Sequence, residues 1–229
     1  MKILAVDSCS IVATCALMAN DRIVAEFSLN DRKTHSVKLL PIIEQTLAFA
    51  ETDIADIDYF AVTVGPGSFT GQRIGIATVK GLAHAAGKPC VAVSSLQALA
   101  HNLPLTTFFV CPIMDARRQQ VYTATFKDGC YIEHDRAISL DCLLLEQESK
   151  DTIFVGDGVA SFKEIIANKM GRHAHFAPSH LLHLRGGSVA YLAKKKIEEN
   201  NICNYNSLLP VYLRLSQAER EYIERSKKK

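Results

Sequence analysis

The chain has 229 residues, of which 48% are hydrophobic and 22% are charged. These proportions are typical of a globular protein and exclude a disordered or fibrous chain, and the length is enough for one domain or two small ones. The net charge of +2 provides no strong attraction to nucleic acid.

The first hundred residues predict three strands followed by alternating helices and strands. Runs of β-branched and aromatic residues favour the strands, and turn residues at 19–21 favour a hairpin between the second and third. The expected strands are 2–7, 11–18, 22–29, 59–64 and 90–93, and the expected helices are 34–51, 71–86 and 95–102. This order predicts a mixed sheet covered by helices.

The second half of the chain, after a short linker at 103–105, repeats this order in part. The expected strands are 106–114, 121–126, 131–138 and 152–155, the expected helices are 140–147, 162–170 and 188–199, and an extended tail follows at 209–214. A repeated order indicates a duplicated fold. We expect a first lobe of residues 1–103 and a second lobe of residues 104–229, whose last helix and tail pack back on the first.

A glycine-rich turn at 65–73 joins the fourth strand to the helix at 71–86. Glycines allow a sharp turn and close backbone approach, and Thr70 is expected to cap the helix. The turn fits neither phosphate-binding fingerprint, because Thr70 stands where the dinucleotide pattern needs glycine and the P-loop Lys-Ser/Thr pair is missing after Gly71. A structural role for the turn is therefore favoured.

The helix at 71–86 is apolar on more than one side, and Ala77, Gly81 and Ala85 form a row of small residues. Such a row lets a second backbone come close. Two interpretations remain open. The helix is either enclosed within its own domain, or it packs on its sheet with one face and on a partner protein with the other.

An acidic residue, Asp7, ends the first strand and is followed by Ser8. A metal–nucleotide complex could bind there, although Asp and Ser also commonly form turns. His35 begins the next helix, but the residue four positions later is Leu39, so the His pair that would place two metal ligands on one helical face is incomplete. We expect His35 to be a hydrogen-bonded structural residue and predict no metal site.

The cysteines are odd in number, scattered and without a C-x-x-C pair: Cys9, Cys15, Cys90, Cys111, Cys130, Cys142 and Cys203. This pattern predicts a reducing compartment without a disulfide framework or zinc site. No apolar run approaches the length of a membrane span. We therefore expect a cytoplasmic protein that does not bind membranes.

Motifs along nearly the whole chain resemble those of the bacterial TsaB (YeaZ) family. They are Asp7-Ser8, His35-Ser36 with Leu39-Leu40-Pro41, the run from Gly65 to Arg73 with Gly75 and Gly81, Val93-Ser94-Ser95-Leu96, Asp115-Ala116-Arg117, Gly156-Asp157-Gly158 and Pro210-Val211-Tyr212-Leu213-Arg214. The resemblance implies an α/β protein with the duplicated actin-like, Hsp70 and sugar-kinase (ASKHA, ribonuclease H-like) fold and a reduced second lobe.

The resemblance also implies a function without catalysis. The family serves as a scaffold in making threonylcarbamoyladenosine on tRNAs that read codons beginning with A. Its partners are the TsaD transferase, in a heterodimer, and the ATPase TsaE; without TsaD it forms a homodimer, and tRNA is bound through the complex. No cofactor is implied, and the metal-binding His pair of TsaD is incomplete here because of Leu39.

In the family, the helices corresponding to about 35–50 and 71–86 make the contact with TsaD. The residues that this implies for the partner interface are His35, Leu39, Leu40, Ile43, Ile74, Ala77, Thr78, Gly81, Leu82 and Ala85. From both helices we expect an exposed apolar surface large enough for a stable contact.

The fold class also implies a set of residues near its nucleotide site. They are Asp7, Ser8, Asp115, Arg117 and Gly158. Asp115 and Arg117 could instead pair with each other. Two alternative functions remain: a metal-dependent peptidase, which would need the missing metal pair or a catalytic triad, and a small-molecule kinase, which would need an intact site between the lobes.

Overall fold

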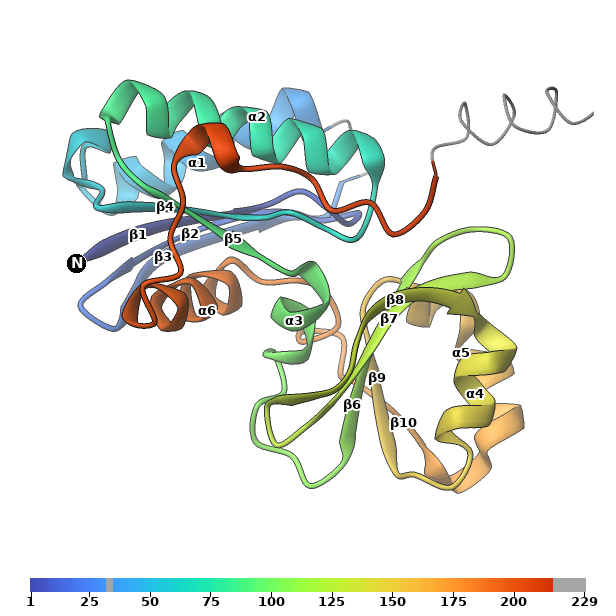
Figure 1. Cartoon of the computed structure of the whole chain (residues 1–229). Helices are drawn as coiled ribbons and strands as arrows, with labels where there is room; N and C mark the ends of the chain where they lie inside the picture. Colours follow the sequence, from blue (N-terminus) through green and yellow to red (C-terminus); the bar gives the residue numbers. More distant parts are fainter. Residues whose placement is uncertain (32–34, 216–229) are drawn as a thin grey trace, which may run out of the picture.

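The computed structural model describes residues 1–31 and 35–215, which form two lobes, each built on a five-stranded sheet (Figure 1). The first sheet has the order β3-β2-β1-β4-β5. Its strands are β1 (Lys2–Asp7), β2 (Ala13–Ala19), β3 (Arg22–Leu29), β4 (Tyr59–Thr63) and β5 (Cys90–Val93). The first three strands are antiparallel neighbours, and β4 and β5 run parallel to β1.

The second sheet repeats this arrangement, with the order β8-β7-β6-β9-β10. Its strands are β6 (Phe109–Asp115), β7 (Gln120–Lys127), β8 (Cys130–Ser139), β9 (Thr152–Val155) and β10 (Ala174–Phe176). Again three antiparallel strands come first, and the last two run parallel to the first of them. The predicted duplicated α/β fold is confirmed.

The helices cover both sheets. One helix from the second half of the chain packs on the first lobe, and one from the first half packs on the second lobe. On the first sheet, α1 (His35–Phe49) and α2 (Phe69–Ala86) lie on one face, while α6 (Gly186–Glu198) returns from the second half of the chain to cover the other (Figure 1). The short helix α3 (Ser95–Ala100) follows β5 but packs on β6 and β7. The outer helices of the second lobe are α4 (Leu140–Gln147) and α5 (Gly158–Met170).

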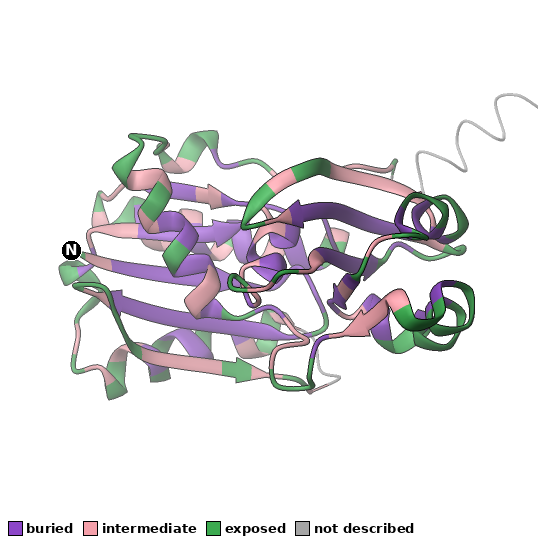
Figure 2. Cartoon of the chain, turned by 90° about the horizontal axis from the view of Figure 1, so that it is seen from below, coloured by how far each residue is buried: buried purple, intermediate pink, exposed green. Residues whose placement is uncertain are grey.

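The central strands are buried on both faces, whereas the edge strands β3 and β8 are partly exposed (Figure 2). Along β1, side chains alternate between two cores because successive residues of a strand point to opposite faces. Leu4 and Val6 join the cluster under α1 and α2, while Ile3 and Ala5 join a cluster with α6 that continues into the second lobe. The cores of the two lobes are therefore continuous through α3 and α6.

The segment after α6 crosses the first lobe as an extended tail. Cys203 pairs with Cys90 at the edge of β5, Leu208 is buried in the core under α2, and the amide of Val211 donates to the carbonyl of Val64 at 2.8 Å. The tail then reaches the second lobe, where the guanidinium of Arg214 donates to the carbonyl of Ala116. This segment thus bridges the two lobes.

The structure differs from the sequence predictions at several element boundaries and adds one strand. The helix expected at 162–170 begins earlier, at Gly158. The positive φ of Gly156, 110°, prevents the helix from extending further toward the N-terminus. The three-residue strand β10 was not predicted, being too short to carry a periodic signal. The expected start of the first helix, at residue 34, lies outside the described residues.

Among the helices of residues 1–31 and 35–215, none has the combination of length and apolar character needed to cross a membrane.

Candidate functional site

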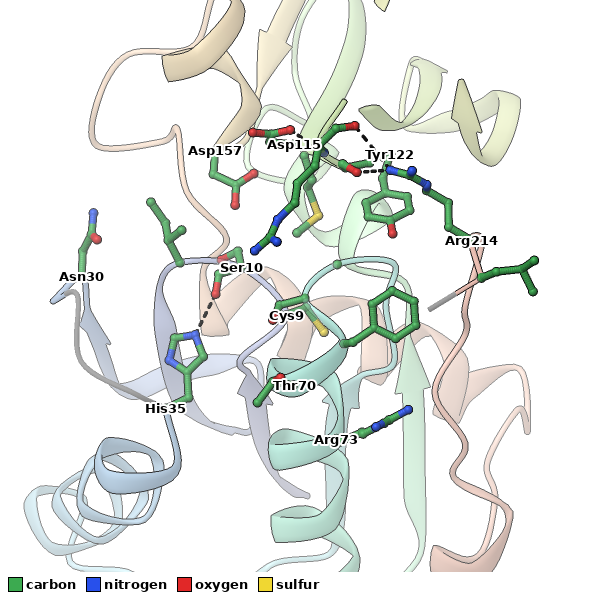
Figure 3. Close-up of a pocket in the computed structure, with 18 of the residues that line it drawn as sticks. Cys9, Ser10, Asn30, His35, Thr70, Arg73, Asp115, Tyr122, Asp157 and Arg214 are labelled. Atoms are coloured by element: carbon green, nitrogen blue, oxygen red, sulfur yellow. Dashed lines mark hydrogen bonds between the residues drawn. The ribbon is translucent and has the colours of Figure 1, made fainter. Parts of the chain in front are cut away.

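A cavity of about 1130 Å³ lies between the two lobes (Figure 3). Its first-lobe wall comes from the turn after β1 and from the starts of α1 and α2, and its second-lobe wall comes from the end of β6 and the start of α5. Charged side chains of both signs line it: Asp31, Arg73, Asp115, Arg117, Asp157 and Arg214. The cavity can therefore accommodate a polar molecule.

The glycine-rich turn packs tightly against the turn after β1. The amide of Ser68 donates to the carbonyl of Cys9 at 2.8 Å. A Cβ added at Gly67 would lie 2.3 Å from the carbonyl oxygen of Cys9, and one added at Gly71 would lie 2.0 Å from that of Ser8. These glycines are therefore required by close backbone packing, as the structural interpretation of the turn predicts.

The cap of α2 is Ser68, so the prediction that Thr70 caps this helix is wrong. Ser68 has an extended backbone, and its hydroxyl accepts a hydrogen bond from the amide of Gly71 at 3.2 Å. The helix begins one residue before Thr70, at Phe69, which places Thr70 within the first turn and its side chain at the cavity. An N-cap must precede the first helical residue, and Thr70 does not.

Three of the candidate nucleotide-proximal residues lie behind the cavity wall. Asp7 and Ser8 are fully buried, the hydroxyl of Ser8 donating to the carbonyl of Gly71 at 2.8 Å. The carboxylate of Asp7 accepts from the amide of Cys9 at 3.0 Å and from the hydroxyl of Thr63, while burial raises its pKa. Gly158 packs on the backbone of β6. In the described structure, none of the three lines the cavity.

Asp115 and Arg117 do line the cavity, and they interact through the backbone. The amide of Arg117 donates to Oδ1 of Asp115 at 2.7 Å. Residues Arg117, Arg118 and Gln119 all have positive φ, between 54° and 61°. Consecutive left-handed residues other than glycine are uncommon and occur where surrounding contacts hold them. Here Arg214 contributes such a contact by donating to the carbonyl of Ala116.

Asp157 is the cavity residue with the most unusual environment. Its carboxylate extends from the start of α5 toward the first lobe (Figure 3). Its Oδ1 is sealed from solvent and has no hydrogen-bond partner within the described residues. Burial is the main cause that raises its pKa to about 6, and the nearby carboxylates of Asp115 and Asp7 act in the same direction. The resemblance to the fold class implies a role for the neighbouring Gly158 and not for Asp157.

We expect Asp157→Asn to stabilise the chain above about pH 6. The pKa of Asp157 in the folded chain is about 6, whereas an unfolded Asp has about 3.9. Between these values the unfolded state loses its proton first, so wild-type stability falls as the pH rises. The variant should gain about 1–3 kcal/mol at pH 7 and nothing below about pH 4, measured by urea unfolding across this range. An equal gain at both pH values would contradict this assignment.

His35 has the structural role that was predicted for it. Its Nε2 donates to the carbonyl of Ser10 at 2.7 Å, which ties the start of α1 to the turn after β1 (Figure 3). Within residues 1–31 and 35–215, no group of three His, Cys, Asp or Glu residues is placed to hold a metal ion.

Outside the cavity, α1 and α2 present an exposed face of apolar and small residues, here called the outer face: Val37, Leu40, Ala77, Gly81 and Ala85. The side chains of Val37 and Leu40 are 63% and 47% exposed. Ile74, Thr78 and Leu82 are partly exposed beside the small residues. The interpretation that α2 is enclosed within its own domain is therefore wrong.

Two residues expected at a partner interface belong to the core instead. Leu39 and Ile43 are 1% and 2% exposed and pack under α1 against the first sheet. Both side chains lie on the face of α1 that packs against the sheet, so they are not part of the outer face.

The repeated sheet order, with a cavity between the lobes, defines a protein of the actin-like ATPase and sugar-kinase fold class. One structure of this class, the activator of the 2-hydroxyisocaproyl-CoA dehydratase from Clostridium difficile with bound ADPNP, superposes with a TM-score of 0.55 at 11% identity, covering 88% of this chain and 97% of its own. At this identity the likeness concerns the fold alone.

Closer relatives identify the family. The family model "TsaD: tRNA N6-adenosine threonylcarbamoyltransferase" matches residues 22–222. The tRNA threonylcarbamoyladenosine biosynthesis protein TsaB of Bacillus subtilis is 33% identical, over 99% of this chain and 100% of its own length. The structure of YeaZ from Pseudomonas aeruginosa has a TM-score of 0.79 at 26% identity, covering 93% of this chain and 99% of its own. The chain belongs to the TsaB (YeaZ) family.

Proposed function

We propose that this chain is a non-catalytic scaffold that pairs with a TsaD transferase in the biosynthesis of threonylcarbamoyladenosine on tRNA, in an assembly joined by the ATPase TsaE. The relatives in Bacillus subtilis and Escherichia coli carry the name of a protein of this biosynthesis. The match of a TsaD family model to residues 22–222 indicates that TsaD and this chain share a related domain. A contact between equivalent surfaces of two related domains would have the geometry of a symmetric dimer interface.

The observation that carries the proposal is the outer face, and Gly81 above all. Glycine within a helix lowers stability by about 0.5–1 kcal/mol relative to alanine. A Cβ at Gly81 would meet nothing within 4 Å, so the packing of this chain does not require glycine there. A helix of another protein approaching along Ala77, Gly81 and Ala85 would require it.

The neighbouring apolar side chains extend the same surface. Val37 and Leu40 of α1 are exposed, and α1 lies beside α2. A standard interface buries about 1,200–2,000 Å² in total, and the proposal assigns this contact to the pair of helices. In the absence of TsaD, the outer face of a second copy would cover this surface in a symmetric homodimer. On this proposal tRNA is bound through the complex.

Two buried residues, Leu39 and Asp7, support a role without catalysis. Leu39 occupies the position of a second helical histidine and is buried, so His35 has no partner ligand four residues away. Asp7 at the end of β1 is enclosed by Thr63 and Cys9. The alternatives of a metal-dependent peptidase and a small-molecule kinase predict, respectively, stoichiometric metal in the purified protein and ATP binding by the chain alone. We expect neither in metal analysis and nucleotide titration.

Pairing is tested by size-exclusion chromatography with light scattering, on the chain alone and mixed with TsaD of the same organism. We expect a dimer alone and a one-to-one complex in the mixture. If both folded proteins keep their separate masses in the mixture, the scaffold role is contradicted.

A further inference from the structure

Two cysteines from distant parts of the sequence lie directly opposite each other. Cys90 begins β5, and Cys203 lies in the tail after α6. Their backbones form an antiparallel bridge in which each amide donates to the other's carbonyl, at 2.8 and 2.9 Å. In such a hydrogen-bonded pair the Cα atoms are about 5.5 Å apart. That Cα separation lies within the range found in disulfides, about 4.4–6.8 Å. The Cβ atoms of opposite residues, about 4.5–5.5 Å apart, must approach to about 3.5–4.5 Å, so closing the bond requires a small shift of the tail.

The side chains share one environment as well as one register. Directly opposite residues of an antiparallel pair project to the same side. Cys90 is fully buried in the core under α1 and α2, and Cys203 packs against the same cluster while remaining partly accessible. Both thiols are free in this structure. Cys203 is therefore partly accessible to solvent, and the buried Cys90 lies directly opposite it.

We propose that Cys90 and Cys203 form a disulfide when the chain meets a small-molecule disulfide such as oxidised glutathione, and that this bond fastens the tail to β5. The other accessible cysteines, Cys130 and Cys142, lie on β8 and α4 of the second lobe. They have no comparable bridge to each other among the strand pairings of the described residues.

The exchange proceeds in two balanced steps. The thiolate of Cys203 attacks one sulfur of oxidised glutathione, forms a mixed disulfide and releases one glutathione thiolate. The thiolate of Cys90 then attacks the Cys203 sulfur, forms the Cys90–Cys203 bond and releases the second glutathione. The two protein thiols lose two protons and two electrons, and the oxidant accepts both electrons. Burial raises the pKa of Cys90 to about 12, so the second step is expected to be slow.

The bond would reinforce contacts that already hold the tail across the first lobe. Beyond Cys203, the ring of Tyr205 lies 4.6 Å from that of His84 on α2, and Leu208 is buried. Further along, Tyr212 stacks on Phe69 at 4.8 Å. The disulfide would close a covalent loop around the whole second lobe, since β6 to β10 all lie between the two cysteines. Large loops gain the most stability from closure in the chain-entropy model.

The test uses the full chain with Cys130→Ser and Cys142→Ser, which removes the exposed thiols. The protein is equilibrated in glutathione redox buffers, folded and in concentrated urea, and mapped by mass spectrometry without reduction. We expect a linked Cys90–Cys203 peptide, with an equilibrium constant about 100-fold larger in the folded chain than in the unfolded one. The oxidised protein should also unfold about 5–10 °C above the reduced one.

The same background with Cys203→Ser serves as the matched control and should yield no linked peptide and no rise in melting temperature. An equal equilibrium constant in folded and unfolded chain, or a stable glutathione adduct on Cys203 without the Cys90 link, would overturn the proposal.

Discussion

Gly81→Arg should leave the chain folded and weaken its pairing with TsaD by at least about 100-fold. The added side chain meets nothing within this chain, so the fold has no reason to change. Between two closely approaching helices, however, it would hold the backbones apart and bury an unpaired charge. The self-association of the chain should be lost together with the mixed complex. Titration calorimetry with TsaD gives the affinity, and circular dichroism melting monitors the fold.

The matched control is Ala167→Arg, which places the same side chain on an exposed position of α5 in the second lobe. This variant should pair as the wild type does. Pairing of Gly81→Arg with unchanged affinity, in a protein of unchanged melting temperature, would exclude the outer face as the interface.

A second glycine of the same helix should behave in the opposite way. Gly71→Ala is expected to destabilise the chain by about 3 kcal/mol, because its Cβ would lie 2.0 Å from the carbonyl oxygen of Ser8 and α2 would have to move off the turn after β1. Gly81→Ala is the same chemical change farther along the same helix, where the added Cβ meets nothing. It should stabilise the chain by about 0.5–1 kcal/mol. Urea unfolding of both variants measures the two effects.

If Gly71→Ala unfolds at the same urea concentration as the wild type, the close packing of α2 on the turn after β1 does not limit stability. Equal changes in the free energy of unfolding for Gly71→Ala and Gly81→Ala would likewise contradict the difference in packing between the two positions.

Most of the fold could be predicted from the sequence, because strands and helices of this chain carry clear apolar periodicity. The duplicated order of elements was visible for the same reason. The short strand β10 and the true start of α5 carried no such signal. The spacing of Val37, Leu40 and Ile43 predicts that all three lie on the core face of α1, but only Ile43 is buried. Only the position of the sheet decides which apolar side chains of this helix are covered.

The site was less predictable, because it depends on residues that the sequence does not bring together. The resemblance to the fold class implies a role for Gly158 near a nucleotide, whereas the cavity is lined by Asp157 next to it. Arg214 reaches the cavity only because the tail crosses from one lobe to the other. Cys90 and Cys203 have no local pattern at all, and the scattered cysteines suggested no pairing. Distances between such residues arise from the topology and cannot be read from spacing.

The central claim, that this chain supports a transferase without being one, is tested most directly by reconstituting the tRNA modification. TsaD, TsaE and this chain are combined with unmodified tRNA and the threonylcarbamoyl-adenylate donor, and threonylcarbamoyladenosine is quantified by nucleoside mass spectrometry. We expect product from the full mixture, little when this chain is omitted, and none when TsaD is omitted. Product formed by this chain without TsaD, or full yield in its absence, would contradict the account.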